Sequence, residues 1–150
     1  MQLLEGAKIL LSKKNMIKEF LNSENNSNIP GLGLIIREDD YGSLQYAKQL
    51  INDCVYTGIN CVFENINSNT DINSIINIID AFNKNELITS ILLQFPLPNN
   101  LKEYEKEIVN RIDSRKIIDA PFWKMDLSRE DTWPGTPYGI YLLLKYYNLH

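Results

Sequence analysis

The sequence predicts a three-layer α/β/α domain with a mostly parallel sheet of about four strands. Stretches with helical apolar spacing alternate along the chain with short apolar runs, which is typical of βαβ units with right-handed crossovers. The runs are nearly continuous rather than alternating, as in parallel strands covered on both faces. Because 150 residues is the usual size of one domain, residues 1–150 are expected to fold as a single unit.

The first part of the chain predicts a helix, a strand and a second helix. Residues 6–20 carry apolar side chains at helical spacing with Lys and Glu between them. Residues 32–36 form a short β-branched run after a Pro-Gly pair, which favours a buried strand. Ser43 is a plausible N-cap for a helix reaching Thr57, and Gly58 follows as the expected C′ residue.

The middle of the chain repeats this alternation. Residues 60–66 predict a second strand, and Asp71 is expected to cap a helix that carries isoleucines and Phe82 on one face. Residues 87–95 give the strongest strand signal, because their apolar run is almost unbroken. The prolines that follow cannot donate to a strand ladder and are expected to end this strand.

The last third predicts a helix over residues 101–111, a short strand at Ile117-Ile118 and a final helix over residues 137–147. Thr136 as N-cap with Pro137 at the first helical position is a good start signal for the final helix. No internal repeat or boundary to a second domain is visible in the sequence.

Composition excludes several classes of function. A net charge of −4 and a pI near 5.0 argue against nucleic acid as a partner, since such proteins need clustered Lys and Arg. Cys54 and Cys61 have no companions at metal-ligand spacing, so neither a metal site nor a disulfide framework is expected. No apolar stretch approaches the roughly 18 to 20 residues of a membrane span. The sequence therefore predicts a cytoplasmic protein that does not bind membranes.

Polar residues follow two of the predicted strands. Ligands in open α/β sheets bind beyond the carboxyl ends of the strands. Gln94 lies at the end of the strand at 87–95, just before a proline-rich turn, and Asp119 follows Ile118. An amide and a carboxylate at one sheet edge can read a planar heterocycle through paired hydrogen bonds.

Four segments together carry a resemblance to a known family. They are PGLGLIIREDDYGSLQYAKQLINDC, SILLQFPLPNNL, IDSRKIIDA and PGTPYGIYLLLKYYNL. In order and spacing they resemble the P-G-L-A, Q-L-P-L-P, D-V-D-G-F and P-C-T-P-x-G blocks of the bifunctional methylenetetrahydrofolate dehydrogenase/methenyltetrahydrofolate cyclohydrolase family. The resemblance covers nearly the whole chain and is to the folate-binding, catalytic N-terminal domain of that family.

The resemblance implies a set of site residues. In this family a lysine is the general acid/base, a tyrosine one helical turn earlier stacks on the folate, a glutamine tunes the lysine and an aspartate holds the pterin. Gln94 and Asp119 match the family's catalytic glutamine and aspartate, whereas the lysine position is Leu50. The expected substrate-binding residues are Tyr46, Gln94, Pro96, Leu97, Pro98, Asp119 and Pro137.

Departures from the family pattern predict weak catalysis. Lys48 is a poor replacement for the missing lysine, because two residues from Tyr46 its side chain points to nearly the opposite side of the helix. Glu38, Tyr41, Ala120-Pro121 and Gly135 also stand where the family has other residues. No G-x-G-x-x-G-like phosphate loop is present. The family's Rossmann-like cofactor domain is therefore expected to be lacking, with NAD(P) bound only if a separate domain supplies it.

Three hypotheses follow from these observations. The first is a divergent folate-enzyme domain that binds a reduced folate or related pterin with weak or no activity, acting as a regulatory or dimer partner of itself or of a full-length relative. The second is the active catalytic half of a split or truncated dehydrogenase/cyclohydrolase. The third is a remnant that binds no ligand.

Overall fold

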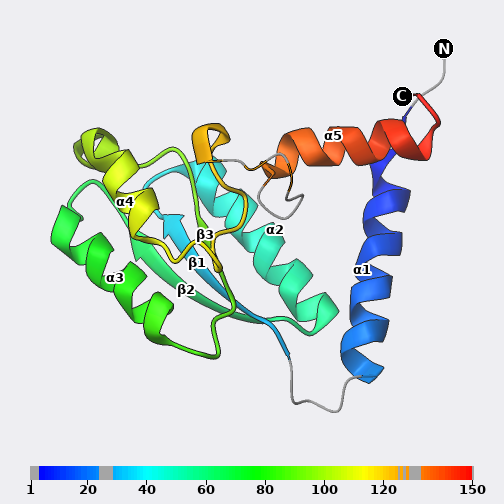
Figure 1. The fold of residues 1–150 in the computed structure, drawn as a ribbon, viewed down its shortest axis with the longest axis horizontal. Coiled ribbons are helices and arrows are strands. Elements are labelled where there is room, and N and C mark those ends of the chain that lie inside the picture. Colours follow the sequence, from blue (N-terminus) through cyan, green and yellow to red (C-terminus); the bar gives the residue numbers. More distant parts are fainter. Residues whose placement is uncertain (1–3, 24–28, 125, 127, 129–132, 150) are drawn as a thin grey trace.

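The computed structural model shows the predicted three-layer α/β/α arrangement, with helices on both faces of a small parallel sheet (Figure 1). The structure describes residues 4–149 apart from 24–28, 125, 127 and 129–132. Helix α2 covers one face of the sheet, and α3 with α4 covers the other. The predicted fold class is thus confirmed.

The sheet has the order β2-β1-β3, and both strand pairs are parallel. Its strands are β1 (Gly31–Arg37), β2 (Asn60–Ile66) and β3 (Ser90–Leu93). β3 is shorter than the predicted strand at 87–95. The fourth predicted strand is reduced to a single parallel bridge between Ile91 and Ile117. Two adjacent apolar residues are enough to pack beside β3 but too few to extend a ladder.

Helix α2 (Tyr41–Thr57) follows β1 after a short turn. Its N-cap is Asp40, whose carboxylate accepts a hydrogen bond from the Ser43 amide at 2.8 Å. The expectation that Ser43 caps this helix is therefore wrong. Aspartate and serine are both good caps, and the helix begins at the earlier one. At the other end Gly58 has φ of +86°, which confirms its predicted C′ role.

The opposite face carries α3 (Ile72–Lys84), which Asp71 caps as predicted, and α4 (Glu105–Arg111). The predicted helix over residues 101–111 is wrong in its first turn, which is part of a 3₁₀ helix, η1 (Asn99–Tyr104). Pro98 accepts an i to i+3 bond from Leu101 there, and this tighter turn buries Leu101 in the core. A two-pronged ion pair from Arg111 to Asp80 joins α4 to α3.

Two further helices lie outside the layer formed by α2. Helix α1 (Gly6–Ser23) packs against α2, and α5 (Gly135–Tyr146) reaches from the sheet edge to the start of α1 (Figure 1). A short 3₁₀ turn, η2 (Phe122–Lys124), precedes α5. The predicted N-cap of the last helix, Thr136, is wrong. The helix begins at Gly135, whose amide is satisfied by the distant Asp119 rather than by a local cap.

The apolar core consists of two clusters, one on each face of the sheet. Alternate β1 side chains point to opposite faces, so Ile35 joins the cluster under α3 and α4 while Leu34 joins the cluster under α2. Both residues are fully buried. Cys54 is a free thiol in the second cluster, and burial raises its pKa to about 11. It is therefore a core residue with an inert thiol.

Helices α1 and α5 are unusually exposed for their composition. Leu21 is the one buried residue of α1, and α5 has none, although apolar side chains predominate in α5. The chain exposes 9797 Å², whereas a compact protein of its mass exposes about 7,900 Å². In the part of the chain that the structure describes, no helix is both long and apolar enough to cross a membrane.

Gly31 offers a sharp test of the sheet. A Cβ placed at Gly31 would lie 1.9 Å from the Leu87 carbonyl oxygen, whereas a Cβ at Gly139 in α5 would meet nothing within 4 Å. We expect Gly31→Ala to lower the free energy of unfolding by about 1–3 kcal/mol through overpacking. The control Gly139→Ala should leave it unchanged or raise it by about 0.5–1 kcal/mol. Chemical denaturation of both variants checks this, and equal stabilities would contradict the observed approach of β1 to residue 87.

Candidate functional site

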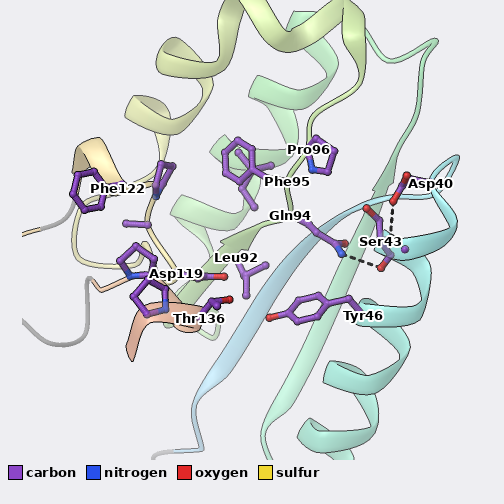
Figure 2. Close-up of a pocket in the computed structure, with 16 residues that line it drawn as sticks. Asp40, Ser43, Tyr46, Leu92, Gln94, Phe95, Pro96, Asp119, Phe122 and Thr136 are labelled. Carbon is purple, nitrogen blue, oxygen red and sulfur yellow. Dashed lines mark hydrogen bonds between the residues drawn. The ribbon is translucent and has the colours of Figure 1, made fainter. Parts of the chain in front are cut away.

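A pocket of about 630 Å³ opens at the carboxyl ends of β1 and β3, where the sequence places its unusual polar residues (Figure 2). The α2 N-terminus, the turn after β3, the loop after Ile118 and the α5 N-terminus all contribute to it. The lining residues with polar side chains are Asp40, Ser43, Tyr46, Gln94, Asp119 and Thr136. The topology therefore gathers residues that are far apart in the sequence around one cavity.

Gln94 is held firmly at the end of β3. Its backbone amide donates to the Ile35 carbonyl at 3.0 Å, and its side-chain Nε2 donates to the Ser43 carbonyl at 2.9 Å. The residue is 6 % exposed, and its Oε1 has no partner among the described residues. Figure 2 shows the amide lying between β3 and the first turn of α2. Gln94 thus presents a fixed, unused acceptor beside the pocket.

Tyr46 contributes an aromatic ring from the second turn of α2. About half of its surface is exposed, and its hydroxyl end extends toward the Asp119 side of the pocket (Figure 2). Burial raises the pKa of the Tyr46 phenol, and the negative charge of Asp119 raises it further. The phenol is therefore protonated at neutral pH, so its ring can stack on a planar ligand while its hydroxyl donates.

Asp119 joins two segments of the pocket wall. Its Oδ1 accepts a hydrogen bond from the Gly135 amide at 2.6 Å, at the start of α5. The residue has φ of +51°, a left-handed conformation that Asp tolerates better than most side chains. A Cβ at position 135 would lie 3.3 Å from Oδ1, so glycine allows this close approach. The second carboxylate oxygen, Oδ2, takes no part in this bond and can accept from a ligand.

Position 50 carries no group that could exchange a proton. Leu50 is half-buried and packs against the apolar cluster under α2, outside the pocket lining. Lys48 is exposed and does not line the pocket. Among the described lining residues there is no Lys, Arg or His. The hydrogen bond of Gln94 goes to a backbone carbonyl and not to an ammonium group.

The structure gathers most of the predicted site but not all of it. Tyr46, Gln94, Asp119, Pro96 and Pro137 line the pocket. The other two predicted substrate-binding residues lie elsewhere. Leu97 is buried in the core under α3 and α4, and Pro98 is buried at the start of η1.

Sequence reasoning missed Ser43 as a site residue, since it was interpreted as a helix cap. Its side chain is 4 % exposed, lines the pocket and has an Oγ without a partner among the described residues. Its position three residues before Tyr46, one helical turn away on the same face, was the available signal. Thr136 was also missed, because only the tertiary structure brings α5 to the sheet edge. For Phe122 the sequence favoured packing of a loop against the core over a place in a pocket, and the structure puts it in the pocket lining.

The family follows from comparison with known sequences. Residues 4–119 match the family model described as tetrahydrofolate dehydrogenase/cyclohydrolase, catalytic domain. This match spans most of the chain and includes β1, α2, Gln94 and Asp119. The chain belongs to the tetrahydrofolate dehydrogenase/cyclohydrolase family. The predicted resemblance to the N-terminal domain of these bifunctional proteins is confirmed.

The relatives that match this chain are about twice as long as the part of them that it covers. It is 32% identical to the bifunctional protein FolD of Acetivibrio thermocellus over 151 residues, covering 93% of this chain and 52% of the relative. It is also similar to the FolD of Campylobacter hominis, with 29% identity, 99% of this chain and 54% of the relative. The chain thus spans about half the length of the curated relatives it matches.

Solved structures of the tetrahydrofolate dehydrogenase/cyclohydrolase family share the fold. The crystal structure of the bifunctional enzyme FolD from Campylobacter jejuni aligns with a TM-score of 0.84 and 30% identity, covering 99% of this chain and 54% of that one. A bifunctional 5,10-methylenetetrahydrofolate dehydrogenase/cyclohydrolase from Thermoplasma acidophilum aligns with a TM-score of 0.83 and 25% identity, over 99% and 54%.

Titration of Tyr46 tests the geometry of the pocket. The Tyr46 phenol should ionise above its ordinary pKa of 10.0, because burial and the Asp119 charge both disfavour the phenolate. Asp119→Asn should lower this pKa without returning it to the ordinary value, since burial is the larger cause. Ultraviolet difference titration against Tyr46→Phe isolates this phenol from the other tyrosines. A pKa that does not respond to Asp119→Asn would contradict the proximity of the two side chains.

Proposed function

We propose that this chain is a divergent folate-binding domain that holds a reduced folate or related pterin in the pocket and performs the family's reactions weakly or not at all. Membership of the tetrahydrofolate dehydrogenase/cyclohydrolase family supports the class of ligand. The relatives that it matches are named bifunctional proteins, and this chain spans about half of their length.

The pocket suits a flat, nitrogen-rich ligand. The Tyr46 ring offers a stacking surface, and Phe122 and several prolines add apolar walls. Gln94 Oε1 and the Asp119 carboxylate are acceptors, so they complement N–H groups on the edge of a pterin. In this proposal Asp119 holds the pterin, Tyr46 stacks on it and Gln94 faces the one-carbon end, as the family pattern implies.

The aliphatic side chain at position 50 is the observation that carries the weak-activity part of the proposal. General acid/base catalysis typically contributes about 10²- to 10⁴-fold, and leucine can neither give nor take a proton. Leu50 packs in the apolar cluster under α2, and exposed Lys48 does not line the pocket. Ring opening of a methenyl bridge by water would then proceed without its proton-transfer partner.

Hydride transfer needs a dinucleotide that this chain is not proposed to bind alone. The sequence has no G-x-G-x-x-G-like loop of the kind that holds a pyrophosphate. NAD(P) would therefore have to be held by a separate cofactor domain. When present it would accept the hydride, while this chain's residues would only bind and orient the folate.

The rival proposal is an active catalytic half, in which another group replaces the missing lysine. Hydrolysis of methenyltetrahydrofolate, followed by loss of its near-ultraviolet absorbance, separates the two. We expect turnover close to that of buffer. Turnover well above buffer that disappears in Asp119→Ala would establish the rival. A remnant without a ligand would show no thermal shift with folates, whereas a folate at 100-fold its dissociation constant should stabilise by about 2.7 kcal/mol.

Restoring the amine is the direct test of position 50. Leu50→Lys should raise methenyltetrahydrofolate hydrolysis by about 10²-fold or more, because it supplies an ionisable group one turn after Tyr46. Val55→Lys is a matched control, since Val55 is 77 % exposed on the same helix and lies outside the pocket. Equal rates for the two variants would show that other changes in the pocket wall suppress the reaction.

A partner role is the second candidate, favoured by the exposed apolar face of α1 and α5. Leu10, Phe20, Ile140 and Tyr146 each expose half or more of their surface. The chain exposes roughly 2,000 Å² more than a compact protein of its mass, and a standard interface needs about 800 Å² per partner. We propose that this face pairs with a second copy of the chain; pairing with a full-length relative is the alternative form.

Sedimentation velocity tests the partner role. The chain should form a dimer at micromolar concentration, and Leu10→Glu combined with Ile140→Glu should make it monomeric by burying unpaired charge in the contact. Val62→Glu controls for added charge, because Val62 is also half exposed but lies on β2. A monomer at every concentration would exclude self-pairing, and mixing with a full-length FolD would then decide the alternative.

A further inference from the structure

The 3₁₀ turn η2 brings an aromatic ring to the mouth of the pocket. Phe122 lines the pocket and is 77 % exposed, so most of its ring is free to be covered by a ligand. Figure 2 shows Phe122 and Tyr46 on opposite sides of Asp119. A flat ligand held at Asp119 therefore has an aromatic ring on either side, and burying such rings against a ligand is favourable.

Apolar packing does not hold η2 in place. None of its three residues is buried. The chain before it is fixed by Ala120, which is buried in the core under α3 and α4, and by Asp119, which accepts a hydrogen bond from the Gly135 amide. Since η2 itself contributes no side chain to the core, the position of Phe122 depends on polar contacts.

Lys124 supplies the contacts that join η2 to α4. Its backbone amide donates to the Pro121 carbonyl at 2.8 Å, which closes the 3₁₀ turn. Its ammonium group donates to the Val109 carbonyl at 3.3 Å and to Asn110 Oδ1 at 3.2 Å. Both acceptors lie in the last turn of α4, where the helix end favours a cation. Partial burial lowers the pKa of the Lys124 ammonium, so the group has left water to make these two bonds.

The connection between Asp119 and η2 is particular to this chain. Ala120 and Pro121 stand where the family pattern has Gly and Phe. We propose that Lys124 is a positioning residue, whose anchor on α4 holds η2 so that Phe122 forms the outer wall of the pocket and covers the bound ligand. This inference rests on the proposed folate binding and adds to it one ligand contact and the residue that orients it.

Calorimetric titration with tetrahydrofolate under anaerobic conditions tests both roles. Phe122→Ala should weaken binding about three- to tenfold, the size of one aromatic contact. Lys124→Met should weaken binding by a similar factor, and Lys124→Arg should restore it, because a guanidinium can donate to the same acceptors. Lys116→Met is the matched control and should bind as the unaltered chain does. Lys116 donates to three carbonyls at the end of α3 and lies outside the pocket lining.

The double variant separates positioning from a general loss of stability. If Lys124 acts through Phe122, then Lys124→Met should weaken binding no further in the Phe122→Ala background. Losses that multiply would overturn the positioning role, and unchanged binding by Phe122→Ala would overturn the ligand contact.

An independent variant weakens the anchor from the other side. Asn110→Ala removes one acceptor on α4 without altering η2, so it gives the same test even if Lys124→Met does not fold. It should cause a smaller loss of affinity, which also vanishes in the Phe122→Ala background. Binding that survives every variant would overturn this inference alone, whereas no binding of tetrahydrofolate by the unaltered chain would overturn the proposed function with it.

Discussion

The central strand β1 is the constraint on which the rest of the structure depends. It pairs with β2 along its whole length and with β3 over four residues, and its first six residues are buried. Because its alternate side chains face opposite layers, Leu34 and Ile35 belong to different apolar clusters. Gly31 lets the strand approach residue 87 closely, which no side chain would permit. Both layers of helices are thus fixed relative to one buried strand.

The pocket is a direct consequence of that arrangement. The turn at the end of β1 supplies Asp40, which starts α2 and thereby sets the positions of Ser43 and Tyr46. The neighbouring strand β3 ends at Gln94, whose amide is held by the first turn of α2. The loop that carries Asp119 is in turn fixed to the start of α5. These three parts of the pocket wall are therefore each held by a hydrogen bond between a side chain and a backbone group.

Binding and catalysis separate in this molecule because they depend on different groups. The aromatic ring, the amide and the carboxylate that suit a pterin are all present around the cavity. The proton-transferring amine of the family pattern is replaced by Leu50, which is half-buried and packs against the apolar cluster under α2. A side chain that packs against an apolar cluster contributes to stability and supplies the pocket with no amine that could transfer a proton.

The sequence by itself determined the elements that depend on local pattern. Three features were predictable: strand β1, helix α3 with its Asp71 cap, and the end of α2 at Gly58. The spacing of apolar residues, the hydrogen bonding of a cap and the conformational freedom of glycine all act within a few residues of one another. The family motifs likewise single out Tyr46, Gln94 and Asp119 by their order and spacing along the chain, and all three line the pocket.

Tertiary structure decided what depends on groups distant along the chain. Ser43 is a pocket residue because Asp40 already caps the helix and Gln94 packs against it. Helix α5 begins at Gly135 because Asp119, sixteen residues away, satisfies its first amide. Ile117 meets the sheet only where Ile91 of β3 lies beside it in the folded chain. None of these outcomes is encoded in a local pattern, since each requires a hydrogen-bonding partner that only the folded chain brings near.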